Sequence, residues 1–233
     1  MSSEVKGFPE KFPVRDDDRR PLRYRTATLL SRITLLVVAR RLRIEGAANI
    51  PGAGPLLVAC NHTSNLDPAV MGSYFPHMLF CMAKRELYSP PALAWFLAGV
   101  NCIPVDRGGA DRRAVTRALD VLRRGRRLLI FVEGTRSPDG AMRRAEVGIA
   151  FLARRSGAAV LPVAICHTDT RGSGPPRRLR RRDIVVRYGT PFTLDLGGRR
   201  DDRLIADEIA ERIARLLPAG RRGVYGVGAA DPS

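Results

Sequence analysis

The sequence predicts an α/β fold: a single domain in which a mostly parallel or mixed central sheet is flanked by helices, with an amphipathic helix at its N-terminal end. Two observations carry this prediction. Short apolar runs alternate with helical stretches along the chain. Most of these runs are continuously apolar, which is typical of strands buried on both faces by helices. With 233 residues, the chain has the size of one ordinary domain.

The individual elements follow from apolar spacing. The continuous runs predict six strands, at residues 56–60, 78–83, 102–105, 128–132, 160–165 and 184–186. Residues 109–124 repeat small and aliphatic side chains at helical spacing, with charges on the outer face. Residues 201–217 repeat leucine and isoleucine in the same way, and Pro218 ends that helix. We therefore expect one folded domain over residues 43–217 and a flexible, glycine-rich tail over residues 218–233.

The N-terminal part divides into two segments. Residues 1–20 mix charged residues and prolines without periodicity, and we expect them to be irregular. Residues 21–42 predict a helix with arginines opposite an apolar stripe, which consists of Leu22, Leu29, Ile33, Leu36 and Val37. Eight arginines and no acidic residue occur from Arg19 to Arg43, which favours a helix in the interface of an anionic membrane. The alternative is a helix that packs this stripe on the domain's own core.

The same segment is not expected to cross a membrane. Its charge-free runs, residues 26–31 and 33–39, are interrupted by Arg32 and fall well below the roughly 20 residues of a spanning helix. Residues 1–20 are polar and charged, so no secretory signal is expected. We therefore expect a peripheral or monotopic protein on the cytoplasmic side of the cell membrane.

The net charge of +17 is the unusual feature of the composition, with 40 Lys and Arg against 23 Asp and Glu. One interpretation is a compositional bias toward arginine, and the other is an anionic partner: a lipid phosphate, a membrane surface, an acidic carrier protein or nucleic acid. The chain has few aromatic residues and no stacking cluster, so nucleic-acid binding is the remote alternative. The run Arg177–Arg182 predicts an exposed basic loop, to which we assign no function.

Cysteines and histidines give no sign of a metal site. The four cysteines lie in apolar surroundings and are too far apart for a C-x2-C motif, which is typical of buried thiols in a reducing compartment. The three histidines have no ligand-like spacing. Neither a metal nor another cofactor is expected.

The main candidates for chemistry are His62 and Asp67, the ends of an H-x4-D motif. His62 follows an expected strand, where α/β proteins place reactive groups. An imidazole can take a proton from an alcohol when a carboxylate holds its other nitrogen in the correct tautomer. The alternative is that Asp67 and Pro68 are only the N-cap and first residue of a helix.

Arginines follow two other expected strands. Residues 133–137 combine a carboxylate, a flexible glycine, two hydroxyls and a guanidinium. Arg136 can form bidentate bonds with a phosphate, and Gly134 allows backbone N–H groups to approach it closely. Arg107 follows its strand beside two glycines. Two arginines at strand ends predict one anionic site, although an ordinary turn with incidental charges is the alternative for residues 133–137.

In order and spacing, four blocks of this sequence resemble those of the lysophosphatidic acid acyltransferases, the bacterial 1-acyl-sn-glycerol-3-phosphate acyltransferases of the glycerophospholipid acyltransferase superfamily. The blocks are NHTSNLD (61–67), IPVDR (103–107), FVEGTRS (131–137) and LPVAI (161–165). The resemblance runs from Ile44 to Leu194. One departure is Val132, which stands where that family usually has proline and which removes no reactive group.

The resemblance implies a role for each matching residue. His62 is then the general base, and Asp67 is the acid that orients it. The residues implied to bind the glycerol-phosphate part of the acceptor are Arg107, Glu133, Gly134, Thr135 and Arg136. Lys84 matches a basic position of the family and is expected to meet an oxyanion or a phosphate. A solvated lysine is the alternative at this position.

The resemblance also implies the reaction of residues 43–217 as a catalytic domain. A fatty acyl group moves from acyl-CoA or acyl carrier protein, as co-substrate, to the free hydroxyl of 1-acylglycerol 3-phosphate, giving phosphatidic acid for phospholipid biosynthesis. No serine stands in a G-x-S-x-G setting, so we expect transfer without an acyl-enzyme intermediate. The reaction is expected at an anionic membrane surface. Transfer to another lysolipid, a glycolipid or an alcohol stays open, as does a non-catalytic lipid carrier. The sequence indicates neither acyl-chain length, nor the choice of donor, nor oligomeric state.

Overall fold

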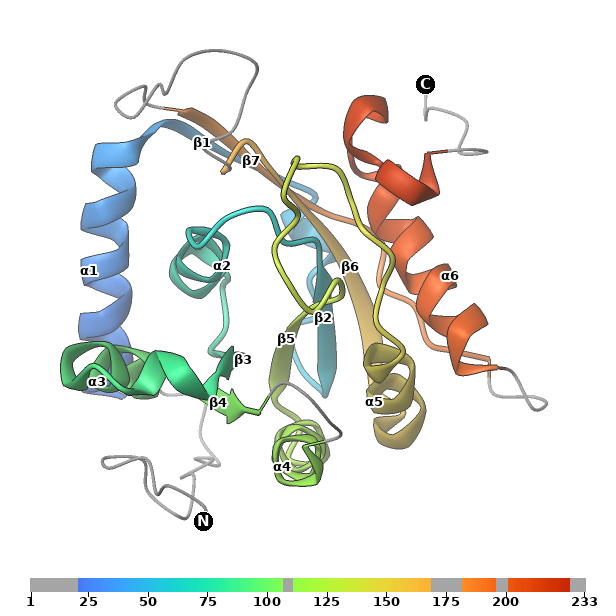
Figure 1. Ribbon diagram of the computed structural model, residues 1–233, viewed down its shortest axis with the longest axis horizontal. Helices are drawn as coiled ribbons and strands as arrows, with labels where there is room; N and C mark the ends of the chain where they lie inside the picture. Colours follow the sequence, from blue (N-terminus) through green and yellow to red (C-terminus); the bar gives the residue numbers. More distant parts are fainter. Residues whose placement is uncertain (1–20, 107–110, 169–181, 196–200, 227–233) are drawn as a thin grey trace.

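The computed structural model describes residues 21–106, 111–168, 182–195 and 201–226, which form one seven-stranded sheet covered by helices (Figure 1). The strands are β1 (Ala39–Glu45), β2 (Leu56–Cys60), β3 (Leu79–Lys84), β4 (Cys102–Val105), β5 (Arg127–Phe131), β6 (Ala159–Cys166) and β7 (Arg182–Tyr188). The α-helices are α1 (Leu22–Val38), α2 (Asp67–Tyr74), α3 (Pro91–Gly99), α4 (Arg112–Arg123), α5 (Gly148–Ser156) and α6 (Asp202–Arg215).

The sheet has the order β1-β7-β6-β2-β5-β3-β4. All its neighbouring strands run parallel except β6 and β7, which are antiparallel. The predicted α/β class with a mostly parallel, mixed sheet is therefore confirmed. Because β2, β5 and β3 are parallel neighbours, the loops that leave their carboxyl ends meet at one edge of the sheet.

Strand β2 shows why its apolar run is continuous. Leu57 and Ala59 pack in a core with side chains of α4, α5 and α6. Leu56, Val58 and Cys60 point the other way, into a second core with side chains of α1, α2 and α3. Both faces of the strand are buried, so no position in it is left for a solvated polar residue. The two helical layers lie on either side of the sheet in Figure 1.

The predicted helix over residues 21–42 is too long. Helix α1 ends at Val38, and residues 39–45 form the edge strand β1, which pairs in parallel with β7. The side chain of Arg40 bonds Asp183 of β7, and Arg187 of β7 bonds Glu45. The strand was missed because it contains three arginines and a glutamate instead of an apolar run; charged residues are common on strands at a sheet edge.

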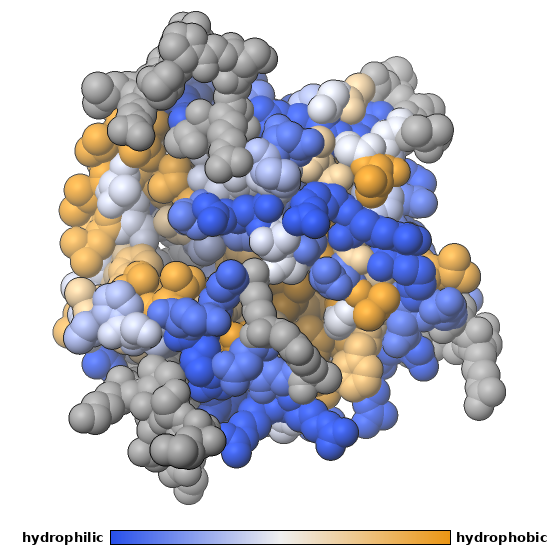
Figure 2. Space-filling view, in the orientation of Figure 1, coloured by the Kyte–Doolittle hydropathy of each residue, from blue (hydrophilic) through white to orange (hydrophobic). Residues whose placement is uncertain are grey.

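The expected alternative for α1, a stripe packed on the domain's core, is wrong. The side chains of α1 that are buried are mostly small or polar: Tyr24, Ala27, Thr28, Ser31 and Leu35. All five side chains of the predicted apolar stripe are exposed. Figure 2 shows these apolar side chains gathered over α1, at the left of the molecule. The helix packs on the domain through its buried face and is also fixed to α2 by polar contacts, in which Arg32 donates two hydrogen bonds to the backbone oxygen of Ser73.

The structure also differs from the expected flexible tail. Residues 219–221 and 223–225 form two 3-10 turns that pack against the loop between β5 and α5. The glycines that predicted flexibility serve this packing, because Gly223 has a φ of 55° and its α-carbon lies against the backbone of Met142. The last seven residues of the predicted tail, 227–233, lie outside the described residues, as do residues 1–20 and Arg177 to Arg181 of the basic loop.

Candidate active site

His62 and Asp67 form a hydrogen-bonded pair at the carboxyl end of β2. The Nδ1 atom of His62 lies 2.8 Å from Oδ2 of Asp67. The imidazole side chain is 14% exposed, whereas the carboxylate is fully buried. Since the carboxylate accepts the hydrogen bond, a neutral imidazole carries its proton on Nδ1 and keeps a lone pair on Nε2. The pair therefore has the form of a base with an orienting acid.

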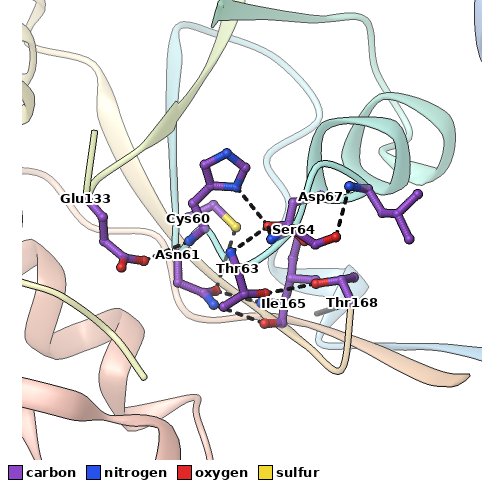
Figure 3. Close-up of polar contacts among 10 residues, drawn as sticks. Cys60, Asn61, Thr63, Ser64, Asp67, Glu133, Ile165 and Thr168 are labelled. Atoms are coloured by element: carbon purple, nitrogen blue, oxygen red, sulfur yellow. Dashed lines mark hydrogen bonds and ion pairs between the residues drawn. The ribbon is translucent and has the colours of Figure 1, made fainter. Parts of the chain in front are cut away.

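The carboxylate of Asp67 does not cap helix α2. Asp67 is the first residue of the helix, and its Oδ2 atom turns back to accept the backbone N–H groups of Thr63 (2.7 Å) and Ser64 (2.8 Å). Figure 3 shows these bonds converging on the one carboxylate. Three N–H donors on one buried oxygen suit a charged acceptor. The alternative of a simple N-cap is wrong, because the side chain holds the His62 loop instead of the helix end.

The backbone and the ring of His62 are also fixed from the neighbouring strand β5. The His62 N–H donates to Oε1 of Glu133 (2.8 Å), and the His62 carbonyl accepts from the N–H of Ser137 (2.8 Å). The imidazole stacks on the ring of Phe131, with centroids 4.1 Å apart and an angle of 21° between the planes. With its backbone and one ring face held, the imidazole presents Nε2 in a fixed direction.

The other side of the His62 loop is anchored to β6. The carboxamide of Asn61 accepts the N–H of Ile165 (2.8 Å) and donates to its carbonyl (3.0 Å), which extends the β2–β6 pairing by a side chain. The hydroxyls of Thr63 and Thr168 bond to each other at 2.9 Å. Figure 3 shows both pairs beneath the loop. Sequence reasoning missed these contacts; the polar residues within the N-H-T-S-N-L-D block were the only available signal.

Glu133 lies inside the protein rather than facing a substrate. Its side chain is 2% exposed, and its second oxygen, Oε2, accepts the backbone N–H of Arg143 (2.9 Å). Burial raises the pKa of this carboxyl to about 7, against the opposing effect of the two N–H groups and the charge of Arg143. The expected direct contact of Glu133 with the acceptor does not fit this geometry, since both oxygens bridge two loops.

The rest of the segment 133–137 exposes the guanidinium of Arg136 to solvent. Gly134 has a φ of 63°, and a side chain there would come within 2.9 Å of the Glu146 Cγ atom. This conformation turns the chain outward after Glu133, so that Thr135 is half-buried and Arg136 exposed. The Arg136 guanidinium has no ion-pair or hydrogen-bond partner among the described residues. It is free to bind an anion beside the His62 loop.

Of the two remaining predicted site residues, the structure describes Lys84 but not Arg107. Lys84 is the last residue of β3, where its exposed side chain lies at the same edge of the sheet as the loop after β5. It makes no hydrogen bond or ion pair with the parts of the chain that are described. Arg107 lies outside the described residues, so its expected place in the site stays a prediction.

Cys60 is not accessible as a nucleophile. Its thiol is buried in the core between β2 and the helices α1 to α3, and burial raises the pKa of the thiol well above its usual value. Across the described ranges, no group of three or more His, Cys, Asp or Glu side chains is arranged to hold a metal ion.

A partly exposed imidazole, held by a buried carboxylate at the carboxyl edge of a mostly parallel sheet, defines the class of this molecule. It is an α/β protein with a hydrogen-bonded imidazole and carboxylate, an arrangement that suits proton abstraction. The family model for acyltransferases matches residues 41–166, and the chain belongs to this acyltransferase family. The matched segment contains β2, β5 and β6, together with His62, Asp67, Glu133 and Arg136.

Similar proteins with curated names point in the same direction. The lyso-ornithine lipid O-acyltransferase of Pseudomonas aeruginosa is 30% identical over 73% of this chain and 57% of its own length. A 1-acyl-sn-glycerol-3-phosphate acyltransferase of the same organism is 33% identical over 57% of this chain and 52% of its own length. The chain thus spans little more than half the length of these relatives.

The fold also matches a solved structure. The crystal structure of the 1-acyl-sn-glycerophosphate acyltransferase PlsC from Thermotoga maritima superposes with a TM-score of 0.66 at 23% sequence identity. The match covers 82% of this chain and 77% of that one. This likeness supports the fold of the part of the chain that is matched.

Proposed function

We propose that the protein transfers a fatty acyl group from an acyl thioester to the free hydroxyl of 1-acylglycerol 3-phosphate, giving phosphatidic acid. The observation that carries this proposal is the 2.8 Å bond between His62 Nδ1 and Asp67 Oδ2, which leaves Nε2 of a partly exposed ring as a base. Membership of the acyltransferase family supports the reaction class.

The proposed reaction needs no covalent intermediate on the enzyme. Nε2 of His62 takes the proton of the acceptor hydroxyl as its oxygen attacks the thioester carbonyl. The imidazolium that forms is stabilised by the carboxylate of Asp67. The tetrahedral intermediate then expels the thiolate, which takes the proton back from Nε2, so that an ester and a free thiol are released. Both CoA and acyl carrier protein remain candidate donors.

We assign the acceptor's phosphate to the edge of the site where Arg136 lies. Arg136 follows β5, the strand next to β2, and its free guanidinium suits bidentate bonding to phosphoryl oxygens. Lys84 at the end of β3 is the second described cation on this edge. We assign Arg107 to the same phosphate from the sequence resemblance alone.

A second acceptor is favoured by one specific observation. The similarity to a lyso-ornithine lipid O-acyltransferase extends over 73% of this chain. Ornithine carries a carboxylate where lysophosphatidic acid carries a phosphate, and a guanidinium binds either group. The base would be the same in both reactions, and only the headgroup contacts would differ.

We also propose that α1 docks the protein on a membrane surface. The exposed stripe of Leu22, Leu29, Ile33, Leu36 and Val37 is joined by Leu30, which is also exposed. Basic side chains of β1 follow directly after the helix, where Arg41 and Arg43 are exposed. Apolar side chains beside arginines are the combination that binds anionic lipid interfaces. Among the described residues, no helix is both long enough and apolar enough to cross a membrane.

The test of the proposed reaction is a product assay. Purified protein is incubated with a series of acyl-CoAs or with acyl carrier protein, and with lysophosphatidic acid, lyso-ornithine lipid or other lysolipids, and products are identified by mass spectrometry. We expect phosphatidic acid as the main product. If acylated ornithine lipid were the only product, the proposed acceptor would be wrong and the proposed base would stand. The absence of acyl transfer to any acceptor would overturn the proposed function.

A further inference from the structure

The short turns at the carboxyl end of the described chain, residues 218–226, are connected to His62 through hydrogen bonds and a short stretch of backbone. They follow α6 and lie beside the loop of residues 132–147, which joins β5 to α5 (Figure 1). The acyltransferase family model ends at residue 166, so these turns lie outside the segment that defines the family.

Met142 is the point where the turns hold this loop. Its backbone N–H donates to the carbonyl of Arg221 (2.9 Å), and its carbonyl accepts from the N–H of Val224 (3.3 Å). Gly223 makes this approach sterically feasible, because a side-chain carbon there would lie 1.9 Å from the Met142 carbonyl oxygen. Its φ of 55° is also a backbone conformation that residues with a side chain rarely adopt.

A second attachment lies three residues further along the loop. The Tyr225 hydroxyl accepts the N–H of Ala145 (2.9 Å) and donates to the carboxylate of Asp207 (2.8 Å). Arg203 bonds the same carboxylate with two nitrogens, at 3.0 and 2.6 Å, and donates to the carbonyl of Ala145 (2.7 Å). Both backbone groups of Ala145 are therefore fixed by side chains of α6 and the turns.

The residue between these attachments contacts Glu133. The N–H of Arg143, next to Met142, donates to Oε2 of Glu133 (2.9 Å), while Oε1 of the same carboxylate accepts the His62 N–H (2.8 Å). One buried side chain thus joins the loop held by the turns to the loop that carries His62. The path from Met142 to His62 therefore passes through only two residues, Arg143 and Glu133.

We propose that Gly223 and Tyr225 are positioning residues for His62, acting through the loop at Met142–Ala145 and the bridging carboxylate of Glu133. For its effect on turnover this proposal rests on the proposed acyl transfer, but the physical connection does not. Reactive groups lose rate steeply when displaced, by about 100-fold for 1 Å. The turns therefore influence catalysis without contacting a substrate.

The matched pair of variants for a test is Gly223→Ala and Gly220→Ala. Both glycines lie in the turns, but a side-chain carbon at Gly220 meets no atom within 4 Å. Gly223→Ala is expected to lower kcat by about 10- to 100-fold with little change in KM for either substrate, whereas Gly220→Ala behaves as wild type. If Gly223→Ala does not fold, Tyr225→Phe removes a single hydroxyl and is expected to lower kcat severalfold.

Amide hydrogen exchange, measured by NMR, tests the connection without reference to turnover. In Gly223→Ala the His62 N–H should exchange at least about 10-fold faster relative to Val58 N–H in the core of β2, which reports global opening. Equal acceleration of both amides, or none, would overturn the proposal. If wild type shows no acyl transfer but Gly223→Ala accelerates exchange at His62 as expected, the proposed function is refuted and the positioning stands.

A double variant separates positioning from a general loss of stability. If Gly223 acts through Glu133, the Gly223→Ala/Glu133→Gln variant should turn over no more than about 2-fold slower than Glu133→Gln alone, since effects on one connection do not add. Independent effects would multiply, and multiplication of the two losses would contradict the proposal.

Discussion

The backbone N–H of His62 donates a 2.8 Å hydrogen bond to the buried carboxylate of Glu133, which also accepts the N–H of Arg143 at 2.9 Å. Glu133 is therefore a bridge between the loop after β2 and the loop after β5. The residue that sequence resemblance assigns to the substrate holds instead the loop that carries His62, the proposed base. The position of His62 therefore depends on Glu133 as well as on its hydrogen-bond partner Asp67.

Glu133 should make stability depend on pH. Burial raises its pKa in the folded protein to about 7, above the ordinary value of 4.5. The stability associated with the neutral carboxyl is thus fully present below pH 4.5 and is lost as pH rises through 7. The free energy of unfolding should fall by roughly 2 to 3 kcal/mol over this interval on account of this group.

Glu133→Gln isolates this contribution. Glutamine keeps one acceptor oxygen but replaces the other with an amide that cannot accept, so it should cost about 1 kcal/mol at pH 5. At pH 8 the variant should be as stable as wild type or more stable, because it carries no buried charge. Urea unfolding of both proteins at several pH values measures the difference, in which other titrating groups cancel. A difference that does not change with pH would contradict the assigned pKa.

Asp67→Asn should remove the orientation of the base. The amide can still accept from backbone N–H groups, but it no longer offers a carboxylate to Nδ1–H, so the tautomer and the imidazolium lose their support. We expect kcat to fall by about 1,000-fold or more, with little change in KM. Steady-state kinetics measure the effect, and thermal unfolding controls for stability. A decrease of less than about 10-fold in a folded variant would show that Asp67 does not act through His62.

Arg136→Ala should weaken acceptor binding. Loss of the free guanidinium removes charge-assisted bonds to the phosphate, and we expect KM for lysophosphatidic acid to rise by about 10- to 100-fold while kcat changes less. The matched control is Arg155→Ala, which removes an exposed arginine of α5 near the amino end of β6. Kinetics with a phosphate-free acceptor complete the test: an equal loss with both acceptors would exclude a phosphate contact.

The face of α1 should determine membrane binding. Replacing Leu29, Ile33 and Leu36 with glutamine should lower binding to anionic vesicles by at least about 10-fold, because apolar area no longer enters the interface. The fold should persist, since these side chains are 56%, 51% and 65% exposed. A control set on the opposite helical layer, Val147, Phe151 and Leu204, is also exposed. Vesicle flotation compares the two triple variants, and equal binding by both would refute the assignment of this face.

Much of the fold was predictable because strands that are buried on both faces appear in the sequence as continuous apolar runs. The strands at 56–60 and 102–105 have the predicted bounds, and helices α4 and α6 lie within the predicted ranges. Strand β1 was missed because pairing with β7, not apolar content, stabilises it. Helices α3 and α5 were not predicted individually: α3 is nearly all apolar and has little helical periodicity, and α5 is only nine residues long.

The site was predictable in its residues but not in its contacts. Motif spacing identified His62 and Asp67, because four intervening residues can form a turn that closes a hydrogen bond between them. Nothing local indicates that Phe131 stacks on the imidazole or that Asn61 bonds Ile165, since these contacts join segments about 70 and 104 residues apart in the chain. The inward orientation of Glu133 likewise depends on Arg143, whose N–H is set by the packing of the loop.

The most direct test of the account is the turnover of His62→Ala, because every proposed step uses Nε2 of this side chain. The assay follows release of free CoA and formation of the acylated lipid, with His77→Gln as a matched histidine variant near the amino end of β3. We predict that His62→Ala folds and binds lipid vesicles as wild type but turns over at least about 1,000-fold more slowly, while His77→Gln keeps its activity. Turnover of folded His62→Ala at a rate near that of wild type would contradict the role of His62 as the base.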